Sequence, residues 1–542
     1  MTTSPADRNA DARFTRRVGL VTAGTMISRL LGLARESVFA WLFGAGLAAD
    51  AFNVAFRIPN FLRDLFAESA LSAAFVPAFV RSLRRDGPDQ AWRFAAAMLN
   101  VLTLAIGLLV IAGLAATPGL VRLVALGFAG QPEKLALTVQ LTRVMLPFLL
   151  LVAWAAWAMG ILNACGTFFV PAVAPGAFNI VSIAVPLATF GWLRGIGVDP
   201  IAGMAWGVTL GALVQFAVQL PGLRRHGFRW QPVLALARPE LRRVLARWLP
   251  VVLGFASWQV SALVNTFLLT FLPEGSVTWV NYAYRIQHLP AGLFGVAISS
   301  VALAEYSHEA AGEAGAAIRA RFRHAMGLVA ALTIPAALLM LVLADPVVRL
   351  VYQHGRFTAL DGRNVAQALA LYCLGIWAAA AARNCAAGFY SLGNTRTPAV
   401  VAALAVSLNI ALNLLLMRRL GFLSFPLATS LAQFCYLAAL FALLRRRLGG
   451  LDGRALIALT LKVTAAAAGA AALAFGLARA WSLVPGSGLL WHRLGHPLLP
   501  AALGIAGYYL LSRLLGIGEV RAAFSQLFAR KREIPGAGMA SK

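Results

Sequence analysis

The sequence predicts an all-α integral membrane protein with 14 transmembrane helices. We expect two repeat-related lobes around a central cationic cavity, plus two C-terminal helices. Three observations lead to this prediction. First, 60% of the 542 residues are hydrophobic and only 12% are charged, which is far from the balance of a soluble domain. Second, apolar runs of roughly 20 residues, long enough to cross a bilayer, recur along the chain. Third, one pattern of polar residues on an apolar helix occurs in both halves of the sequence.

The apolar runs are separated by short connections that carry Gly, Pro or Arg, and these connections mark where each predicted helix ends. The predicted spans are 18–43, 48–80, 91–116, 137–163, 170–193, 200–222, 246–272, 276–304, 323–345, 364–392, 397–417, 422–444, 456–480 and 498–516. The first run is not a cleavable signal peptide, because Arg29 interrupts its apolar core and no small-residue cleavage site follows.

The spans divide the chain into six segments. These are a cytoplasmic N-terminal tail at 1–17, an N-lobe of six helices at 18–222, a basic cytoplasmic connection at 223–245, a C-lobe of six helices at 246–445, two further helices at 446–516 and a basic cytoplasmic C-terminal tail at 517–542.

The net charge of +27 comes mainly from arginines in the connections. Clusters precede the first span, follow the second and fill the sixth connection, and others lie near residues 319–323, 445–447 and 530–532. With 14 alternating spans, all of them fall on one side of the membrane. The excess of positive charge on one side therefore predicts that both termini of this multi-pass protein lie in the cytoplasm. Orientation and anionic headgroups explain this charge, so we expect no nucleic-acid partner.

Motifs for enzymatic chemistry are absent from the sequence. None of the four lysines follows a glycine and precedes Ser or Thr, as a phosphate-binding loop requires. No metalloprotease, nucleophile-elbow or paired-carboxylate motif occurs, and the four cysteines form no C-x-x-C pair. We therefore expect no catalytic residue, no metal site and no cofactor.

The second span carries a stripe of polar residues at helical spacing, so it is amphipathic although it crosses a membrane. The stripe consists of Asp50, Asn53, Arg57, Asn60, Asp64, Glu68 and Ser72. Each charge at the bilayer centre costs about 2.5 to 3.5 kcal/mol, so such residues are functional candidates. The alternative is internal pairing of Arg57 with Asp50 or Asp64. Pairing cannot account for every charge, because the first span adds Arg29 and Arg35 with only Glu36 to match them.

The second half of the chain repeats this pattern. A shift of 228 residues aligns AFRIPNFLRDLF with AYRIQHLPAGLF and places Arg57 on Arg285 and Asp50 on Thr278. Internal repeats of this kind are typical of secondary transporters, whose substrate site lies where the repeats meet. Since the repeated segment keeps no acid beside Arg285, the cavity should be positively charged. Guanidinium groups bind phosphate, so the predicted substrate is a phosphate or diphosphate anion rather than a cationic drug.

Several ordered stretches resemble the MurJ (MviN) family of lipid II flippases, in the multidrug/oligosaccharidyl-lipid/polysaccharide exporter superfamily. They are residues 28–79, which include RLLGLARESVFAWLFGAG, then 265–299, QHGRFT at 353–358, GFYSLGNTRTP at 388–398 and GFLSFPLATSLA at 421–432. The resemblance implies transport of lipid II, an undecaprenyl-diphosphate-linked disaccharide pentapeptide, from the cytoplasmic to the outer leaflet. It also implies a groove for the lipid tail at the last two helices.

The resemblance assigns roles to particular positions. It implies that Arg29, Arg35, Arg63 and Arg285 are cavity arginines, to which the repeated stripe adds Arg57, and that Glu36 and Asp50 are functional acids. Glu36 stands where many relatives have aspartate. Tyr284 and His288 replace acids that some members carry beside Arg285.

Some relatives bind sodium in the second lobe, and the corresponding positions here are Asn265, Asn409, Asn413 and Thr429. Asn265 and Asn413 stand where those relatives have aspartates, which argues against a sodium site. The alternative is an asparagine pair at i and i+4 that forms hydrogen bonds between helices.

The energy source is either the membrane potential or a monovalent cation. Membrane lipids and cell-wall synthesis proteins are the further expected partners. Two other functions stay open: a flippase for another diphosphate-linked glycan, of the O-antigen or exopolysaccharide type, and a membrane scaffold that transports nothing.

Overall fold

The computed structural model describes all residues except 1–4, 65–68, 234–258, 311–314, 483–488 and 522–542. Its described part is helical and contains no strand, which confirms the predicted all-α class. Within that part, nine segments are long and apolar enough to cross a membrane. Four of these segments contain two successive α-helices each, namely Pro132–Ala164, Ile201–Arg225, Ala359–Ser391 and Arg396–Arg447. The predicted number of 14 spans stays a prediction.

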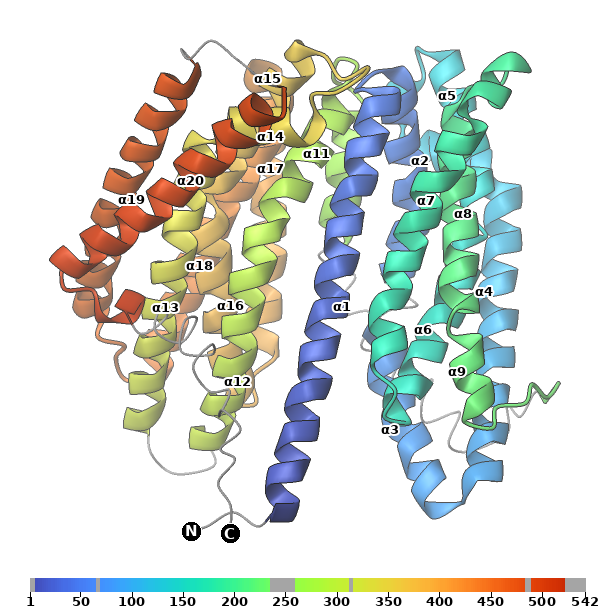
Figure 1. Cartoon of the computed structure of the whole chain (residues 1–542), viewed down its shortest axis with the longest axis horizontal. Coiled ribbons are helices and arrows are strands. Elements are labelled where there is room, and N and C mark those ends of the chain that lie inside the picture. Colours follow the sequence, from blue (N-terminus) through green and yellow to red (C-terminus); the bar gives the residue numbers. More distant parts are fainter. Residues whose placement is uncertain (1–4, 65–68, 234–258, 311–314, 483–488, 522–542) are drawn as a thin grey trace, which may run out of the picture. The chain divides into compact units, whose positions relative to one another are not determined.

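The helices form two compact units. The first comprises Met1–Thr278 together with His354–Thr358, and the second comprises Trp279–Gln353 and Ala359–Lys542. The helices of the first unit up to residue 225 are coloured blue to green in Figure 1. They are α1 (Pro5–Phe43), α2 (Leu47–Arg63), α3 (Ser69–Arg85), α4 (Pro88–Val124), α5 (Pro132–Met145), α6 (Phe148–Ala164), α7 (Phe169–Gly195), α8 (Ile201–Ala217) and α9 (Leu220–Arg225).

Proline divides one predicted span of the first unit. The span expected at 137–163 is two helices, α5 and α6, which meet at Leu146 and Pro147. Proline has no backbone N–H and its ring clashes with the preceding turn, so a helix cannot continue through it unchanged. Lys134 lies in the first turn of α5, three residues before the predicted start of the span.

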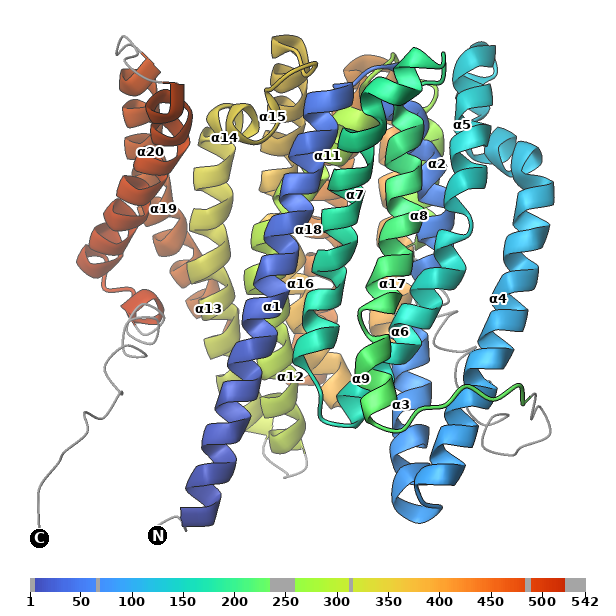
Figure 2. The ribbon, with the colours of Figure 1, turned by 45° about the vertical axis from the view of Figure 1, so that its right-hand side comes forward.

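The second unit contains the rest of α11 (Ser276–Pro290), which begins in the first unit, and the helices that follow it. These are α12 (Ala297–Ala310), α13 (Gly315–Val342), α14 (Ala344–Tyr352), α15 (Ala359–Leu374), α16 (Ile376–Ser391), α17 (Arg396–Leu420), α18 (Ser424–Arg447), α19 (Gly453–Ser482) and α20 (Leu489–Leu514). The last two pack against each other, as Figure 2 shows in red, and α13 packs along α19.

A π-helical stretch at Ala291–Val296 follows Pro290 and separates α11 from α12. Proline and π segments are two common causes of a bend in a helix. The repeat-related α2 also carries an internal proline, Pro59. Both helices that contain the repeated arginine pattern therefore include a residue that disturbs regular helix geometry.

Candidate functional site

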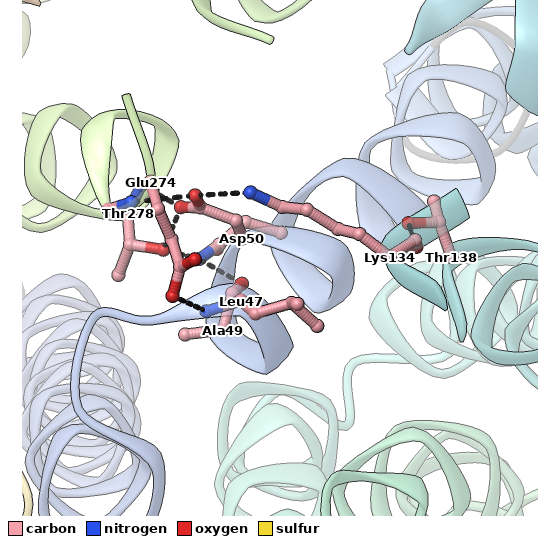
Figure 3. A network of polar contacts seen from close by, with 9 residues as sticks. Leu47, Ala49, Asp50, Lys134, Thr138, Glu274 and Thr278 are labelled. Atoms are coloured by element: carbon pink, nitrogen blue, oxygen red, sulfur yellow. Dashed lines mark hydrogen bonds and ion pairs between the residues drawn. The ribbon is translucent and has the colours of Figure 1, made fainter. Parts of the chain in front are cut away.

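The N-terminal turn of α2 holds a buried carboxylate with four hydrogen-bond donors. Asp50 is 1% exposed. Its Oδ1 accepts hydrogen bonds from the backbone N–H and the hydroxyl of Thr278, at 3.0 and 2.7 Å. Its Oδ2 accepts from the N–H of Gly275 at 2.8 Å and from the ammonium of Lys134 at 3.0 Å. These donors, drawn in Figure 3, offset the cost of burying a charged group.

Asp50 also caps the start of α11. The first N–H groups of a helix have no acceptor within the helix and carry partial positive charge, so a carboxylate placed there is stabilising. In return, Glu274 accepts a hydrogen bond at 2.6 Å from the N–H of Leu47, the first residue of α2. The N-termini of two repeat-related helices therefore cap each other.

Lys134 is the charge partner of Asp50. It is 1% exposed, and its Nζ lies 4.2 Å from the centre of the Phe128 ring. A buried ion pair depends on both partners, because removing one leaves a charge without compensation, at a cost of about 3 to 5 kcal/mol. The pair joins α2 to α5, which also pack against each other.

The sequence indicated Asp50 but missed Lys134. Helical spacing finds neighbours on one helix, whereas Lys134 lies on α5, 84 residues further along the chain. The available signal was its rarity, because the chain has only four lysines and this one begins an apolar helix.

Two of the expected cavity arginines are paired with the acid that follows them. The Nη2 of Arg35 lies 2.7 Å from Glu36 Oε1, and its guanidinium stacks 5.4 Å from the centre of the Phe178 ring. Arg63 lies 2.7 Å from Asp64, whose second oxygen accepts from Gln259 at 2.8 Å. The side chains of both arginines stay partly exposed.

Both acids that sequence spacing offered to Arg57 as partners form other contacts in the structure. Asp50 is bound to Lys134, and Asp64 is bound to Arg63 and Gln259. Arg57 is half-buried on α2, between Asp50 in the first turn and Asp64 directly after the last residue of the helix.

The remaining arginines belong to different units. Arg29 is exposed on α1, and within the described residues it forms no ion pair or hydrogen bond with a side chain. Arg285 is half-buried on the part of α11 that belongs to the second unit. The cavity that would combine Arg285 with the arginines of the first unit stays a prediction.

The expected cation positions include a hydrogen-bonded chain within the second unit. Asn413 donates to Asn409 at 3.3 Å along α17, and Asn409 donates to Thr429 of α18 at 3.3 Å. Asn265 belongs to the first unit. The bond between the i and i+4 asparagines therefore lies within α17, and Asn409 joins α17 to α18 through Thr429. Across the described ranges, no group of three or more His, Cys, Asp or Glu side chains could hold a metal ion.

Fold and site together define a multi-pass helical membrane protein that holds charged groups within its helical bundle, an arrangement typical of transporters. Comparison with known proteins is more specific. The family model described as "Lipid II flippase MurJ" matches residues 39–490. The chain belongs to the MurJ family of lipid II flippases.

Curated relatives agree with this assignment. The chain is 34% identical to the lipid II flippase MurJ of Burkholderia cenocepacia over 386 residues, which are 70% of this chain and 74% of that protein. It is 32% identical to a probable lipid II flippase MurJ of Rhizobium tropici over 524 residues, covering 95% and 96% of the two chains.

Solved structures share the fold. A lipid II flippase MurJ in an inward closed conformation matches with a TM-score of 0.75 at 23% identity, over 94% of this chain and all of that one. An inward-facing multidrug resistance MATE family transporter of the MOP superfamily matches with a TM-score of 0.65 at 16% identity, over 80% and 98%. At these identities the two structures establish the fold alone.

Proposed function

We propose that this protein moves lipid II from the cytoplasmic to the outer leaflet of the bacterial inner membrane by alternating access. The observation that carries the proposal is the match to the lipid II flippase family over residues 39–490. The arginines on α1 and α2 support it, because a diphosphate needs several cationic donors and Arg29, Arg35, Arg57 and Arg63 lie on these two helices. We propose that Arg285 joins them around the substrate.

In this proposal, the arginines gather the diphosphate while the undecaprenyl tail stays in lipid, against α19 and α20. The ion pairs with Glu36 and Asp64 keep Arg35 and Arg63 oriented until the diphosphate competes for them. The bound diphosphate then neutralises the positive charge of the arginines. This favours closure of the two halves over the substrate, because a ligand shifts the equilibrium toward the state that it binds better. We propose that Pro59 and the π segment after Pro290 are the points where the helices bend.

The test is complementation of a strain depleted of its lipid II flippase. Arg29→Ala and Arg285→Ala should abolish complementation, since each removes a charge that binds the diphosphate. Arg85→Ala is the matched control, because Arg85 is exposed at the C-terminal end of α3 and should tolerate the change. Equal tolerance at all three positions, with equal amounts of inserted protein, contradicts the cavity and favours a scaffold.

Substrate identity needs a second measurement. Purified protein in proteoliposomes should move lipid II and should discriminate against an undecaprenyl diphosphate that carries an O-antigen repeat. If the O-antigen-linked lipid moves faster than lipid II, the substrate of this protein is another diphosphate-linked glycan. The leaflet in which lipid II accumulates after depletion tests the direction: it should remain in the cytoplasmic leaflet. We also propose cytoplasmic termini and contact with cell-wall synthesis proteins.

A further inference from the structure

A short connection between α14 and α15 folds with the first unit. Residues His354–Thr358 belong to that unit, although the helices before and after them belong to the second. The backbone N–H of Arg356 donates to the carbonyl of Trp41, near the end of α1, at 3.0 Å. Phe357 is 3% exposed, so the connection is anchored by a buried ring as well as by this hydrogen bond.

Two glycines allow the backbones to approach this closely. Gly44 has a φ of +63°, and a Cβ there would lie 2.7 Å from the carbonyl oxygen of Arg356. Gly355 has a φ of +58°, and a Cβ there would collide with Trp41. Both the positive φ and the close contact exclude other residues, so the position of Arg356 is determined by its backbone.

Beside this connection lies a hollow of about 410 Å³. Its walls are aromatic and aliphatic side chains of α1 and α7 together with the loop residues, namely Trp41, Leu42, Leu187, Phe190, Gly191, Gly355 and Arg356. Trp41 is 46% exposed and Leu187 is 44% exposed, so the hollow opens to the surroundings of the bundle. Tryptophan is enriched where membrane proteins meet the headgroup region.

Arg356 brings a positive charge to this hollow. Its guanidinium carbon lies 5.6 Å from the centre of the Phe190 ring, on α7. No carboxylate among the described residues lies within ion-pair distance of it, and its side chain is exposed. The guanidinium donors are therefore available to an anion, while the ring contact holds the group at the wall of the hollow.

We propose that this hollow binds an anionic membrane lipid, with Arg356 on the lipid phosphate and with Trp41, Leu187 and Phe190 against its apolar portion. The chemistry is complementary, because guanidinium pairs with phosphate oxygens and an aromatic and aliphatic wall accepts acyl or prenyl chain. The site is separate from the proposed transport cavity and does not rest on the flippase function. Occupancy would hold the connection against α1 and α7.

The test is native mass spectrometry of the purified full-length chain with phosphatidylglycerol. The wild-type protein should retain bound lipid, and Arg356→Gln should weaken binding by at least about tenfold, because a charge-assisted hydrogen bond is lost. Arg363→Gln is the matched control, because Arg363 is exposed on α15 and lies outside the hollow. It should bind lipid like the wild type.

A second variant keeps the charge and fills the space. A Cβ at Gly191 meets no atom within 4 Å, so Gly191→Leu should fold, occupy the hollow and reduce lipid binding while Arg356 remains. A parallel titration with undecaprenyl diphosphate identifies the source of the phosphate. If the protein binds undecaprenyl diphosphate but not phosphatidylglycerol, and this binding depends on Arg356, the ligand of the hollow is a prenyl diphosphate. If Arg356→Gln and Gly191→Leu bind both lipids as the wild type does, the proposal is wrong.

Discussion

At the scale of single residues, the ion pair of Asp50 and Lys134 shows what sequence spacing can and cannot find. Asp50 begins a helical stripe of polar residues, and the family resemblance implies that it is a functional acid. Its contacts come from Lys134, 84 positions away, and from Gly275 and Thr278, more than 220 positions away. No periodicity links such distant positions, so only tertiary structure identifies these partners. The same holds for Gln259 beside Asp64.

Removing the charge of Lys134 should destabilise the protein strongly. Lys134→Met leaves the Asp50 carboxylate buried without its cation, and we expect a loss of about 3 to 5 kcal/mol. The measurement is the thermal unfolding midpoint of the purified full chain in detergent. Lys462→Met is the control, because Lys462 is exposed on α19 and its loss should leave the midpoint unchanged.

A double variant separates charge pairing from packing. Adding Asp50→Asn to Lys134→Met removes the uncompensated charge, so the double variant should be more stable than the lysine variant alone. If the two losses simply add, the ion pair is not the interaction that stabilises the contact of α2 with α5.

At the scale of helices, hydrophobic runs predicted where helices exist but not where they break. Residues 137–163 read as one apolar span, whereas the chain forms α5 and α6 with a break at Pro147. Such breaks depend on neighbouring helices, which supply partners for the freed backbone groups. Length and charge also limit the hydropathy argument. Among the described residues, α1 does not qualify as a span and carries several arginines, and α2 is only 17 residues long.

A glycine between α4 and α5 should be essential for their connection. In the short turn Leu126–Phe128, the N–H of Gly127 donates to the Thr270 hydroxyl at 3.2 Å, and a Cβ there would collide with the backbone of Thr270. Gly127→Ala should therefore displace backbone and cost roughly 1 to 3 kcal/mol in unfolding free energy.

The matched control for this change is three residues away. A Cβ at Gly130 meets no atom within 4 Å, so Gly130→Ala should leave the thermal midpoint close to that of the wild type. A midpoint lowered equally by both changes would show that glycine flexibility in the turn matters, and not the close approach to Thr270.

At the scale of the whole molecule, the repeat of 228 residues was visible in sequence because it preserves a polar pattern on two apolar helices. The family resemblance rests on ordered stretches along most of the chain, and the all-helical class rests on the recurring apolar runs. The compact units were harder to predict, because the first unit consists of Met1–Thr278 and, in addition, the distant segment His354–Thr358. Composition and periodicity do not show which short connection packs against which helix.

Transport should respond to membrane potential without ATP. Moving about two negative charges outward through a 100 mV, inside-negative potential releases roughly 4 to 5 kcal/mol, since each charge contributes about 2.3. In proteoliposomes, imposing this potential should accelerate outward movement of lipid II relative to zero potential, and reversing its sign should slow it. A rate that is independent of potential but dependent on a monovalent cation would assign the coupling to that cation.

The mutual capping of α2 and α11 has a consequence for biosynthesis. Leu47 obtains its acceptor, and Asp50 three of its four donors, from residues that are translated about 225 positions later. At about 5 to 20 residues per second, the N–H of Leu47 lacks its acceptor, and the Asp50 carboxylate lacks these three donors, for roughly 10 to 45 s. The first half of the nascent chain must therefore wait in the membrane, incompletely assembled, until the beginning of the second half has emerged from the ribosome.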